Sequence, residues 1–226
     1  MSRLLIYKTI LYRCPLFAGL TDAQLEYALR FFSAEIRRHD KGDFLNRPGF
    51  PLPAFGLLLD GNVQVYMVDI DGQEMIMANV SAGDTFGESL WYLRLDAPVY
   101  IRALSACEVL WLNPETIRSQ NAAWNALDAQ LSGRFTAMLA RRTLSMNDRI
   151  QILSKSTLRQ KLIAFFSQCT QHSGKENFTV PFNRSDMAAY LGTERSALSR
   201  ELSRMQKEGI IDFHKNHFQI LINFHE

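Results

Sequence analysis

The sequence predicts an α+β protein with an N-terminal antiparallel β domain, a long helix and a C-terminal winged helix-turn-helix. Three patterns lead to this fold class. Short apolar runs separated by Gly and Asp turns come first, a helical repeat of apolar residues follows, and two short helical stripes meet at Gly192 near the C-terminus. The expected parts are residues 1–112, 113–154 and 155–226.

Two helices are expected before the β domain. Apolar residues predict the first over residues 2–12, and Pro15 would end it. Thr21 and Gln24 have the spacing of a capping box that opens a second helix, through about Phe32. Turn-forming pairs then recur at the spacing of an all-β sandwich or barrel. The strand candidates are residues 54–59, 63–68, 74–80, 99–106 and 109–112.

Composition favours packed domains, since 47% of the 226 residues are hydrophobic. No run reaches the roughly 18 apolar residues of a membrane span, and no signal peptide opens the chain, so we expect a cytoplasmic protein. Charge is uneven. Residues 1–112 hold 10 Lys and Arg against 13 Asp and Glu, whereas residues 155–226 hold 10 against 7, so the basic excess lies at the C-terminal end.

Cysteine and histidine spacing gives no metal or redox site. Cys14, Cys107 and Cys169 are far apart and are expected as free buried thiols. His214 and His217 could share one face of a metal site, but no third ligand is implied, so a hairpin tip is the better interpretation. We find no nucleophile with a base, phosphate loop or metal spacing, and therefore predict that the protein is not an enzyme and has no certain cofactor.

The middle of the chain predicts one long helix. Apolar residues recur every three or four positions, without Pro or paired Gly from Asn121 to Leu153. Such a helix either packs wholly on its own β domain or leaves a stripe for a second copy, and we favour the dimer seam. Residues 154–156 interrupt the stripe as a hinge, and Ser156 or Thr157 would cap the next helix.

Two short helices follow, joined at Gly192. Asn183 or Ser185 would open the first, and Thr193 is the N-cap candidate of the second. A pair of strands should come next, residues 210–213 and 218–222, joined by the basic tip His214-Lys215-Asn216-His217. Outward positions of the second helix, which suit base edges and phosphates, are Arg195, Ser196, Ser199, Arg200 and Arg204. Two short helices joined at a Gly also occur in many folds that do not bind DNA.

Taken in order, six elements between Pro15 and Ile222 resemble the CRP/FNR family of bacterial transcription regulators. They are the stretch from Pro15 to Leu20, Lys41-Gly42-Asp43, Asp60-Gly61-Asn62-Val63, Gly83-Asp84-Thr85-Phe86-Gly87-Glu88, Ala140-Arg141-Arg142, and Leu191-Gly192 with Ser199-Arg200. The resemblance implies a jelly-roll-like β-roll of the cyclic-nucleotide-binding type, a dimerisation helix and a winged helix. It also implies double-stranded DNA, a second copy and RNA polymerase as partners.

The resemblance assigns DNA contacts residue by residue. Arg200 occupies the position that reads a guanine in the family, accompanied by Ser199. Arg195 and Ser196 lie one turn earlier, and many members have Glu where Ser196 stands, so the half-site should differ there. Arg184 is placed for a phosphate. The expected DNA-binding residues are Arg184, Thr193, Arg195, Ser196, Ser199, Arg200 and Lys215.

The nucleotide site departs from the family. Cyclic-AMP-binding members carry an Arg-Ser pair about ten residues after Gly-Glu, but here the stretch is Leu95-Asp96-Ala97-Pro98-Val99-Tyr100. Their adenine-contacting Thr-Ser pair is replaced by Met146-Asn147. We therefore expect no cyclic AMP binding of the usual kind. Expected effector contacts are Tyr66, Gly87, Glu88, Ser89, Tyr100 and Trp124, in an aromatic pocket to which Trp91, Tyr92 and Trp111 could contribute.

The function predicted is that of a homodimeric regulator that binds an inverted repeat under control of a small effector. That effector could be a small aromatic or halogenated aromatic compound, and an unliganded or protein-controlled regulator is equally open. The iron-sulfur branch is not expected, because its N-terminal Cys cluster is missing. An alternative is a nucleotide-binding module that acts on a protein partner through its C-terminal helices; salt dependence of DNA binding would separate the two.

Overall fold

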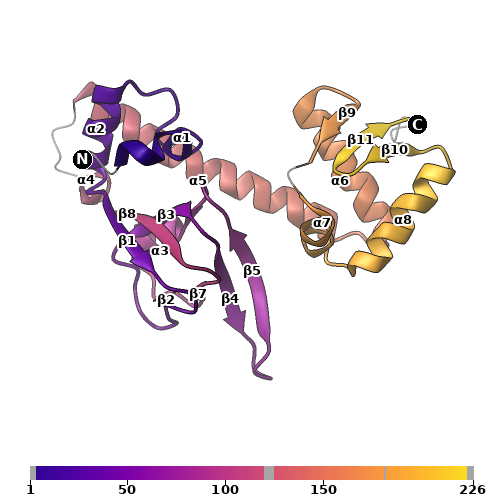
Figure 1. Ribbon diagram of the computed structural model, residues 1–226, viewed down its shortest axis with the longest axis horizontal. Helices are drawn as coiled ribbons and strands as arrows, with labels where there is room; N and C mark the ends of the chain where they lie inside the picture. The colour runs from indigo at the N-terminus through magenta and orange to yellow at the C-terminus, as the bar shows by residue number, and fades with distance from the viewer. Residues whose placement is uncertain (1–3, 120–124, 181, 223–226) are drawn as a thin grey trace. The chain divides into compact units, whose positions relative to one another are not determined.

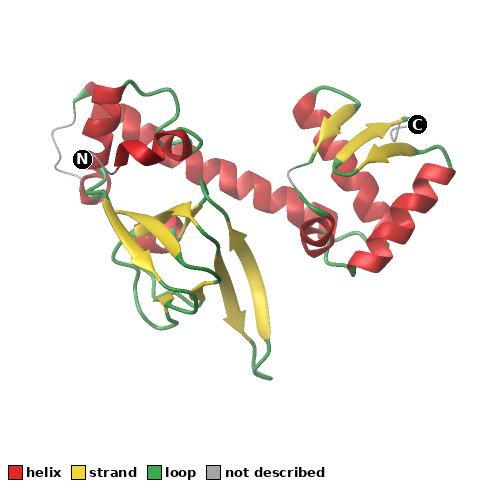
Figure 2. Cartoon of the chain, viewed as in Figure 1, coloured by secondary structure: helices red, strands yellow, loops and turns green. Residues whose placement is uncertain are grey.

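The computed structural model describes residues 4–119, 125–180 and 182–222, which group into two compact units, Met1–Ala140 and Arg141–Glu226. Figure 1 shows an antiparallel β domain in the first unit and helices with a small sheet in the second, and the long helix α5 contributes to both. Coloured by secondary structure, Figure 2 shows that strands dominate the one and helices the other. The predicted fold class is confirmed.

Short helices precede and interrupt the β domain. They are the 3₁₀ helix η1 Leu4–Tyr7, α1 Lys8–Leu11, α2 Asp22–Phe31, α3 Glu88–Leu93 and α4 Glu115–Arg118. Thr21 and Gln24 form the predicted capping box, with both reciprocal hydrogen bonds present. The single helix predicted over residues 2–12 is instead one 3₁₀ turn followed by one α turn, and the chain leaves the helix at Tyr12, three residues before Pro15.

Eight strands of the described first unit form two four-stranded sheets, in the orders β1-β8-β3-β6 and β2-β7-β4-β5. Their bounds are β1 Glu35–His39, β2 Phe44–Asn46, β3 Phe55–Asp60, β4 Val63–Val68, β5 Glu74–Val80, β6 Thr85–Phe86, β7 Tyr100–Ala103 and β8 Cys107–Leu112. All described pairings are antiparallel. The ranges predicted for β4 and β5 are confirmed, whereas β1, β2 and β6 were missed.

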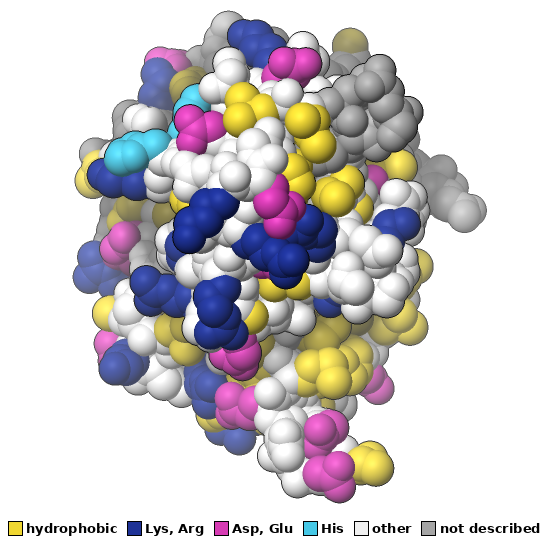
Figure 3. All heavy atoms as spheres, turned by 90° about the vertical axis from the view of Figure 1, so that its right-hand side faces the viewer, with side chains coloured by type: hydrophobic (Ala, Val, Ile, Leu, Met, Phe, Trp, Pro, Cys, Tyr) yellow, Lys and Arg dark blue, Asp and Glu magenta, His cyan; other side chains and the backbone are white. Residues whose placement is uncertain are grey.

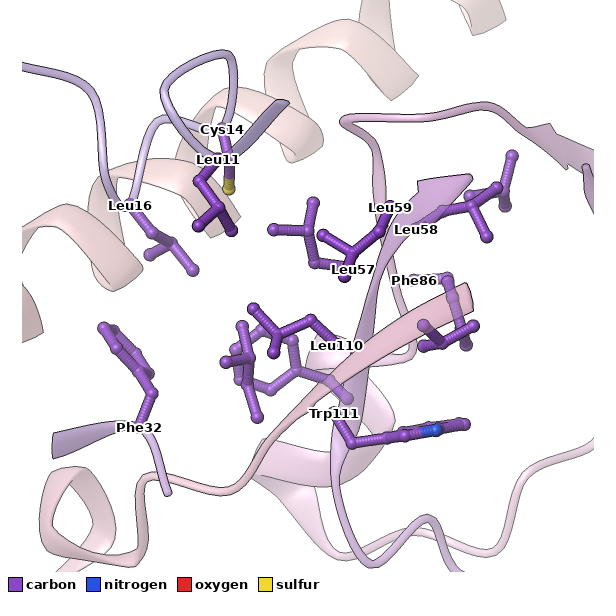
Figure 4. Packing of buried hydrophobic residues seen from close by; sticks show 14 of the residues in the cluster. Leu11, Cys14, Leu16, Phe32, Leu57, Leu58, Leu59, Phe86, Leu110 and Trp111 are labelled. Carbon is purple, nitrogen blue, oxygen red and sulfur yellow. The ribbon is translucent and has the colours of Figure 1, made fainter. Parts of the chain in front are cut away.

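Alternation along β3 and β8 places one set of side chains against the N-terminal helices and the other inside the roll. Figure 4 shows Leu57 and Leu110 on the side of Leu11, Leu16 and Phe32. The next residues along the two strands, Leu58 and Trp111, point to the opposite side of the sheet, where Phe86 also lies. All eight side chains are at most 7% exposed. Both faces of this sheet are therefore buried, which explains why β8 is an unbroken apolar run apart from Glu108.

Helix α5, Ala126–Leu153, has 28 residues and a length of about 42 Å. The Asn125 side chain caps it, since Oδ1 accepts from the backbone N–H of Leu127 at 2.8 Å and of Asp128 at 2.9 Å. The helix contributes to both hydrophobic cores: Leu131, Phe135 and Met138 are buried in the first, and Ile152 is buried in the second. Packing at either end is thereby connected by one continuous element.

The second unit is a winged helix. It contains α6 Leu158–Ser173, β9 Asn177–Thr179, α7 Arg184–Tyr190, α8 Arg195–Lys207, β10 Ile211–His214 and β11 His217–Ile220. The sheet order is β10-β11-β9. Thr157, one of the two candidates, caps α6 in a capping box with Gln160. Phe166 of α6 lies with its ring centroid 5.0 Å from that of Phe218 in β11, which fixes the sheet against the helix.

The turn between α7 and α8 differs in one detail from the prediction. Asn183 caps α7, accepting from the N–H groups of Ser185 and Asp186, and Gly192 has φ of +60°. Thr193 is not the N-cap of α8 but belongs to the preceding turn, where its N–H donates to the Ala188 carbonyl at 3.0 Å. Glu194 takes the cap position without a side-chain cap hydrogen bond.

The three cysteines are free; Cys14 and Cys107 are buried as predicted, whereas Cys169 is only half-buried. Burial raises the pKa of Cys14 and of Cys169 to about 11. Among the described residues, no three His, Cys, Asp or Glu side chains are arranged to hold a metal ion. Within those same residues, no helix is both long enough and apolar enough to cross a bilayer.

Candidate nucleic-acid interface

Helix α8 buries one face and exposes the other. Leu198, Leu202 and Met205 have no exposed surface and belong to the core of the second unit. The opposite face carries the predicted DNA-binding side chains, all of them exposed: Arg195, Ser196, Ser199 and Arg200. The structure thus brings these four together on the first turns of one helix, near its N-terminus, where a helix that enters a major groove makes its base contacts.

The exposed face continues toward the C-terminal end of α8. A shallow hollow of about 460 Å³ is lined there by Ser199, Arg200, Ser203, Arg204 and Lys207. Figure 3 shows a group of Lys and Arg side chains near the middle of this view, with Asp and Glu side chains beside them. This combination of cations and small hydroxyl donors has the chemistry of a phosphate and base-edge surface.

An ion-pair network with α6 holds α8 in place. Arg159 of α6 donates through Nε to Glu201 at 2.6 Å, and through Nη1 and Nη2 to the two carboxylate oxygens of Glu208 at 2.6 and 3.0 Å. The two carboxylates raise the pKa of Arg159, and its hydrogen bonds lower the pKa of Glu208 below the ordinary 4.5. A fork that binds three carboxylate oxygens fixes the orientation of α8 about its axis.

A second contact from α6 fixes the turn before α8. Lys161 Nζ donates to the carbonyl of Leu191 at 3.1 Å. Leu153, at the end of α5, packs against the same turn, since a Cβ added at Gly192 would lie 3.3 Å from its Cδ2. The turn therefore has a polar and an apolar support on the side away from the exposed face of α8.

Arg184 and Lys215 connect the interface to the wing, which is the β10–β11 hairpin. Arg184 begins α7 and is half-buried, with its guanidinium 4.8 Å from the Phe213 ring centroid and 5.4 Å from that of Phe218. Burial lowers its pKa below the ordinary value. Lys215 is exposed in the β10–β11 turn with φ of +54°. Thr193 is half-buried in the turn before α8.

The predicted effector residues Gly87, Glu88 and Ser89 lie at the start of α3. Gly87 adopts φ of +80° as the N-cap, Glu88 is 2% exposed, and Ser89 is exposed. The Thr85 hydroxyl lies 3.4 Å from Glu88 Oε1. α3 itself was missed from the sequence, because six residues are too few to show a helical period.

Buried side chains lie in the region where the resemblance expects a phosphate. A Cβ added at Gly87 would lie 2.7 Å from Cδ1 of the buried Leu52. Ala97 is fully buried, and its N–H donates to the Phe50 carbonyl at 3.2 Å. Pro98 has no N–H to offer. Ala97 and Pro98 thus offer no free N–H to a cyclic phosphate, and an apolar side chain lies against Gly87.

The remaining predicted effector contacts lie apart from this region. Ile101 and Ala103 of β7 are buried in the core, so alternation places Tyr100 on the other face of the sheet. Tyr66 pairs with Tyr100 in register, and the two rings stack with centroids 5.0 Å apart. The structure therefore does not bring this pair into one pocket with Glu88. Trp124 lies outside the described residues.

The other aromatic candidates are packing residues. Trp91 is buried against Phe55 and Phe135, with ring centroids 5.5 and 5.9 Å away, and its Nε1 donates to Asn113 Oδ1 at 2.9 Å. Trp111 is buried against Phe86, with 5.6 Å between centroids. Tyr92 is partly exposed beside Phe135. Burial of this kind cannot be distinguished from ligand contact by sequence pattern.

Comparison with known proteins agrees with both units. The cyclic nucleotide-binding domain model matches residues 36–120, and the Crp-like helix-turn-helix domain model matches residues 160–223. Electron transport regulator A of Shewanella oneidensis is 27% identical over 198 residues, which cover 82% of this chain and 74% of that protein. The cyclic AMP receptor protein of Thermus thermophilus is 24% identical over 197 residues, covering 87% and 88%.

Among solved structures, the c-di-GMP responsive global regulator CLP of Xanthomonas campestris superposes with a TM-score of 0.54, covering 90% of this chain and all of that chain. Its 17% identity makes this a likeness of fold alone. The chain belongs to the CRP/FNR family of bacterial transcription regulators. It is a DNA-binding transcription regulator with a cyclic-nucleotide-binding-type domain, and its relatives are regulators rather than enzymes, as predicted.

The ion-pair network gives a pH-dependent prediction. Because the folded state lowers the pKa of Glu208, the network stabilises the fold at pH values above 4.5, and this contribution is lost as the pH falls through the lowered pKa. Arg159→Gln should lower the melting temperature by a few degrees at pH 7, and the difference from wild type should shrink as the pH falls below 4.5.

Thermal unfolding followed by circular dichroism measures both values. Arg200→Gln is the matched control: it makes the same change on an exposed arginine with no ion pair among the described contacts, and should leave the melting temperature unchanged. A loss in Arg159→Gln that is the same at both pH values would contradict a role of the Glu208 carboxylate.

Proposed function

We propose that this protein is a homodimeric, sequence-specific regulator that binds an inverted-repeat operator under control of a small effector other than cyclic AMP. The observation that carries the proposal is the exposed face of α8, where two arginines and two serines project from the first turns of a helix whose other face is fully buried. The two recognition helices of a dimer would enter successive major grooves about 34 Å apart.

The roles within one half-site follow from chemistry and place in the fold. Arg200 has a planar pair of donors that suits guanine O6 and N7, and Ser199 stands beside it. Arg195 and Ser196 would contact the neighbouring bases or phosphates. Lys215 at the wing tip would contact the backbone. Thr193, half-buried in the turn, and Arg184, stacked on the wing aromatics, would contribute phosphate contacts that also orient the wing.

Arg200→Ala should relax discrimination at one base pair of the operator by about 1–3 kcal/mol, because a bidentate base contact is lost. Lys215→Asn should instead weaken binding to all sequences alike, since only a phosphate contact is lost and Asn tolerates the left-handed backbone at that position. Fluorescence anisotropy on DNA from upstream of the gene, against single-base variants and scrambled duplex, compares them. Equal losses on operator and scrambled DNA for Arg200→Ala would contradict the base contact.

The dimer proposal rests on an exposed apolar stripe of α5. Met146 and Ile150 are 59% and 61% exposed, and Leu153, three residues further, is 38% exposed. The spacing of four and three residues is that of a coiled-coil seam. A stripe of this kind on a charged helix is typical of a surface that is covered by a second copy of the same chain.

Ile150→Glu should convert the dimer to a monomer and reduce operator binding, because a carboxylate would enter the centre of the seam. Leu144→Glu is the matched control: Leu144 is 63% exposed on the same helix, but off the stripe, and its substitution should leave the dimer intact. Sedimentation equilibrium measures the mass. A wild-type monomer at micromolar concentration, or equal effects of the two variants, would refute the seam.

The effector proposal combines the roll and α5. Phe135 and Met138 of α5 are buried in the roll core, and Ile152 is buried in the winged-helix core. An effector that changes packing around α3 and α5 would therefore shift the population of DNA-competent dimers through the same helix. Relatives differ in the nucleotide that their names carry, cyclic AMP in one and c-di-GMP in another, so family membership leaves the effector open.

Cyclic AMP should give no saturable heat in a calorimetric titration at micromolar to millimolar concentrations. The physical reason is the loss of the phosphate partners: Ala97 is buried and already paired, Pro98 has no donor, and Leu52 lies against Gly87. The cyclic AMP receptor protein of Thermus thermophilus serves as the positive control. A saturable micromolar titration of this chain would overturn the prediction.

One measurement distinguishes the proposed DNA-binding regulator from the alternative, a nucleotide-binding module that acts on a protein partner. Phosphate contacts make the DNA affinity fall steeply with salt, whereas such a module would show no salt-dependent DNA binding. With DNA as the target, RNA polymerase is the expected second partner, and the cytoplasm is the expected location.

A further inference from the structure

One arginine on the exposed face of α8 is already paired. Arg204 lies one turn beyond Arg200 and lines the same hollow. Its side chain is 71% exposed, and its Nε donates to Oε1 of Glu208 at 3.1 Å. Among the described contacts, Arg200 has no ion pair. Two neighbouring arginines on one surface therefore differ in their availability to a phosphate.

Glu208 sits where a carboxylate needs cations. It is the C-cap residue of α8, at the end of the helix where the backbone dipole is negative. Arg159 supplies the larger part of its pairing, with bonds to both carboxylate oxygens, and is itself held by Glu201. If Arg204 leaves, Glu208 keeps two charge-assisted hydrogen bonds. The carboxylate is thus fixed in place independently of Arg204.

We propose that Glu208, held by Arg159, is an intramolecular competitor of DNA phosphate for Arg204. This inference rests on the proposed DNA-binding function of the α8 surface. A phosphate that binds Arg204 must first displace the Glu208 carboxylate, so one phosphate contact is weakened on every sequence. Arg200, which would read a base, carries no such competitor. Glu208 therefore lowers sequence-independent affinity while leaving base contacts intact.

The expected size follows from the exposed position of the pair. Surface ion pairs contribute little, so release of Arg204 should strengthen binding to random duplex by about two- to fivefold at low salt. Each additional phosphate contact also steepens the dependence of log affinity on log salt by about 0.9. Binding to an operator should gain by the same factor or less, so specificity should fall or stay constant and should not rise.

The test is fluorescence anisotropy of the full chain on a random 30-base-pair duplex over a series of salt concentrations. Glu208→Gln should bind more tightly and with the steeper slope. Glu176→Gln makes the same charge change in the loop before β9, where the side chain is exposed and has no described ion pair, and should give a smaller gain and an unchanged slope. Melting temperatures show that each variant is folded.

A double-mutant cycle with Arg204→Gln decides whether the gain acts through Arg204. The gain of Glu208→Gln should disappear in the Arg204→Gln background. No gain, a gain equal to that of Glu176→Gln, or a gain that persists without Arg204 would overturn the inference. These outcomes are distinct from failure of the proposed function, in which wild type itself would show no salt-dependent binding to DNA.

Discussion

The burial of one stripe of α8 is the constraint on which the DNA-recognition surface depends. With Leu198, Leu202 and Met205 fully buried, the helix cannot rotate about its axis without exposing apolar area. Arg159 adds a directional constraint that apolar contacts lack. Its planar guanidinium can donate to the carboxylates of Glu201 and Glu208 in only one arrangement. Apolar packing determines which face of α8 is exposed, and the ion pairs with Arg159 determine the direction in which that face points.

One continuous helix, α5, contributes residues to the core of the roll and to the core of the winged helix. The first half of α5 is held by Phe135 and Met138, and its last turn by Ile152. Leu52 is a buried core residue that lies against Gly87, in the region where the resemblance expects a phosphate.

Sequence reasoning succeeded for several features that a local rule determines. The Thr21 capping box, the β4–β5 pair and the left-handed Gly192 all follow from short-range chemistry. It was insufficient for features that depend on contacts between residues far apart in the sequence. Charged β1 is a strand because it pairs with β8, and Arg159 became significant only when folding brought it to two carboxylates 42 and 49 residues away. No periodicity encodes such contacts.

The buried thiols have a consequence for how the protein responds to its surroundings. A thiol reacts with peroxide or a disulfide as the thiolate, and with a pKa of about 11 only about one Cys14 or Cys169 side chain in ten thousand is ionised at pH 7. Cys107 is also buried, and its pKa is raised. Oxidants therefore meet slow-reacting thiols at these three positions.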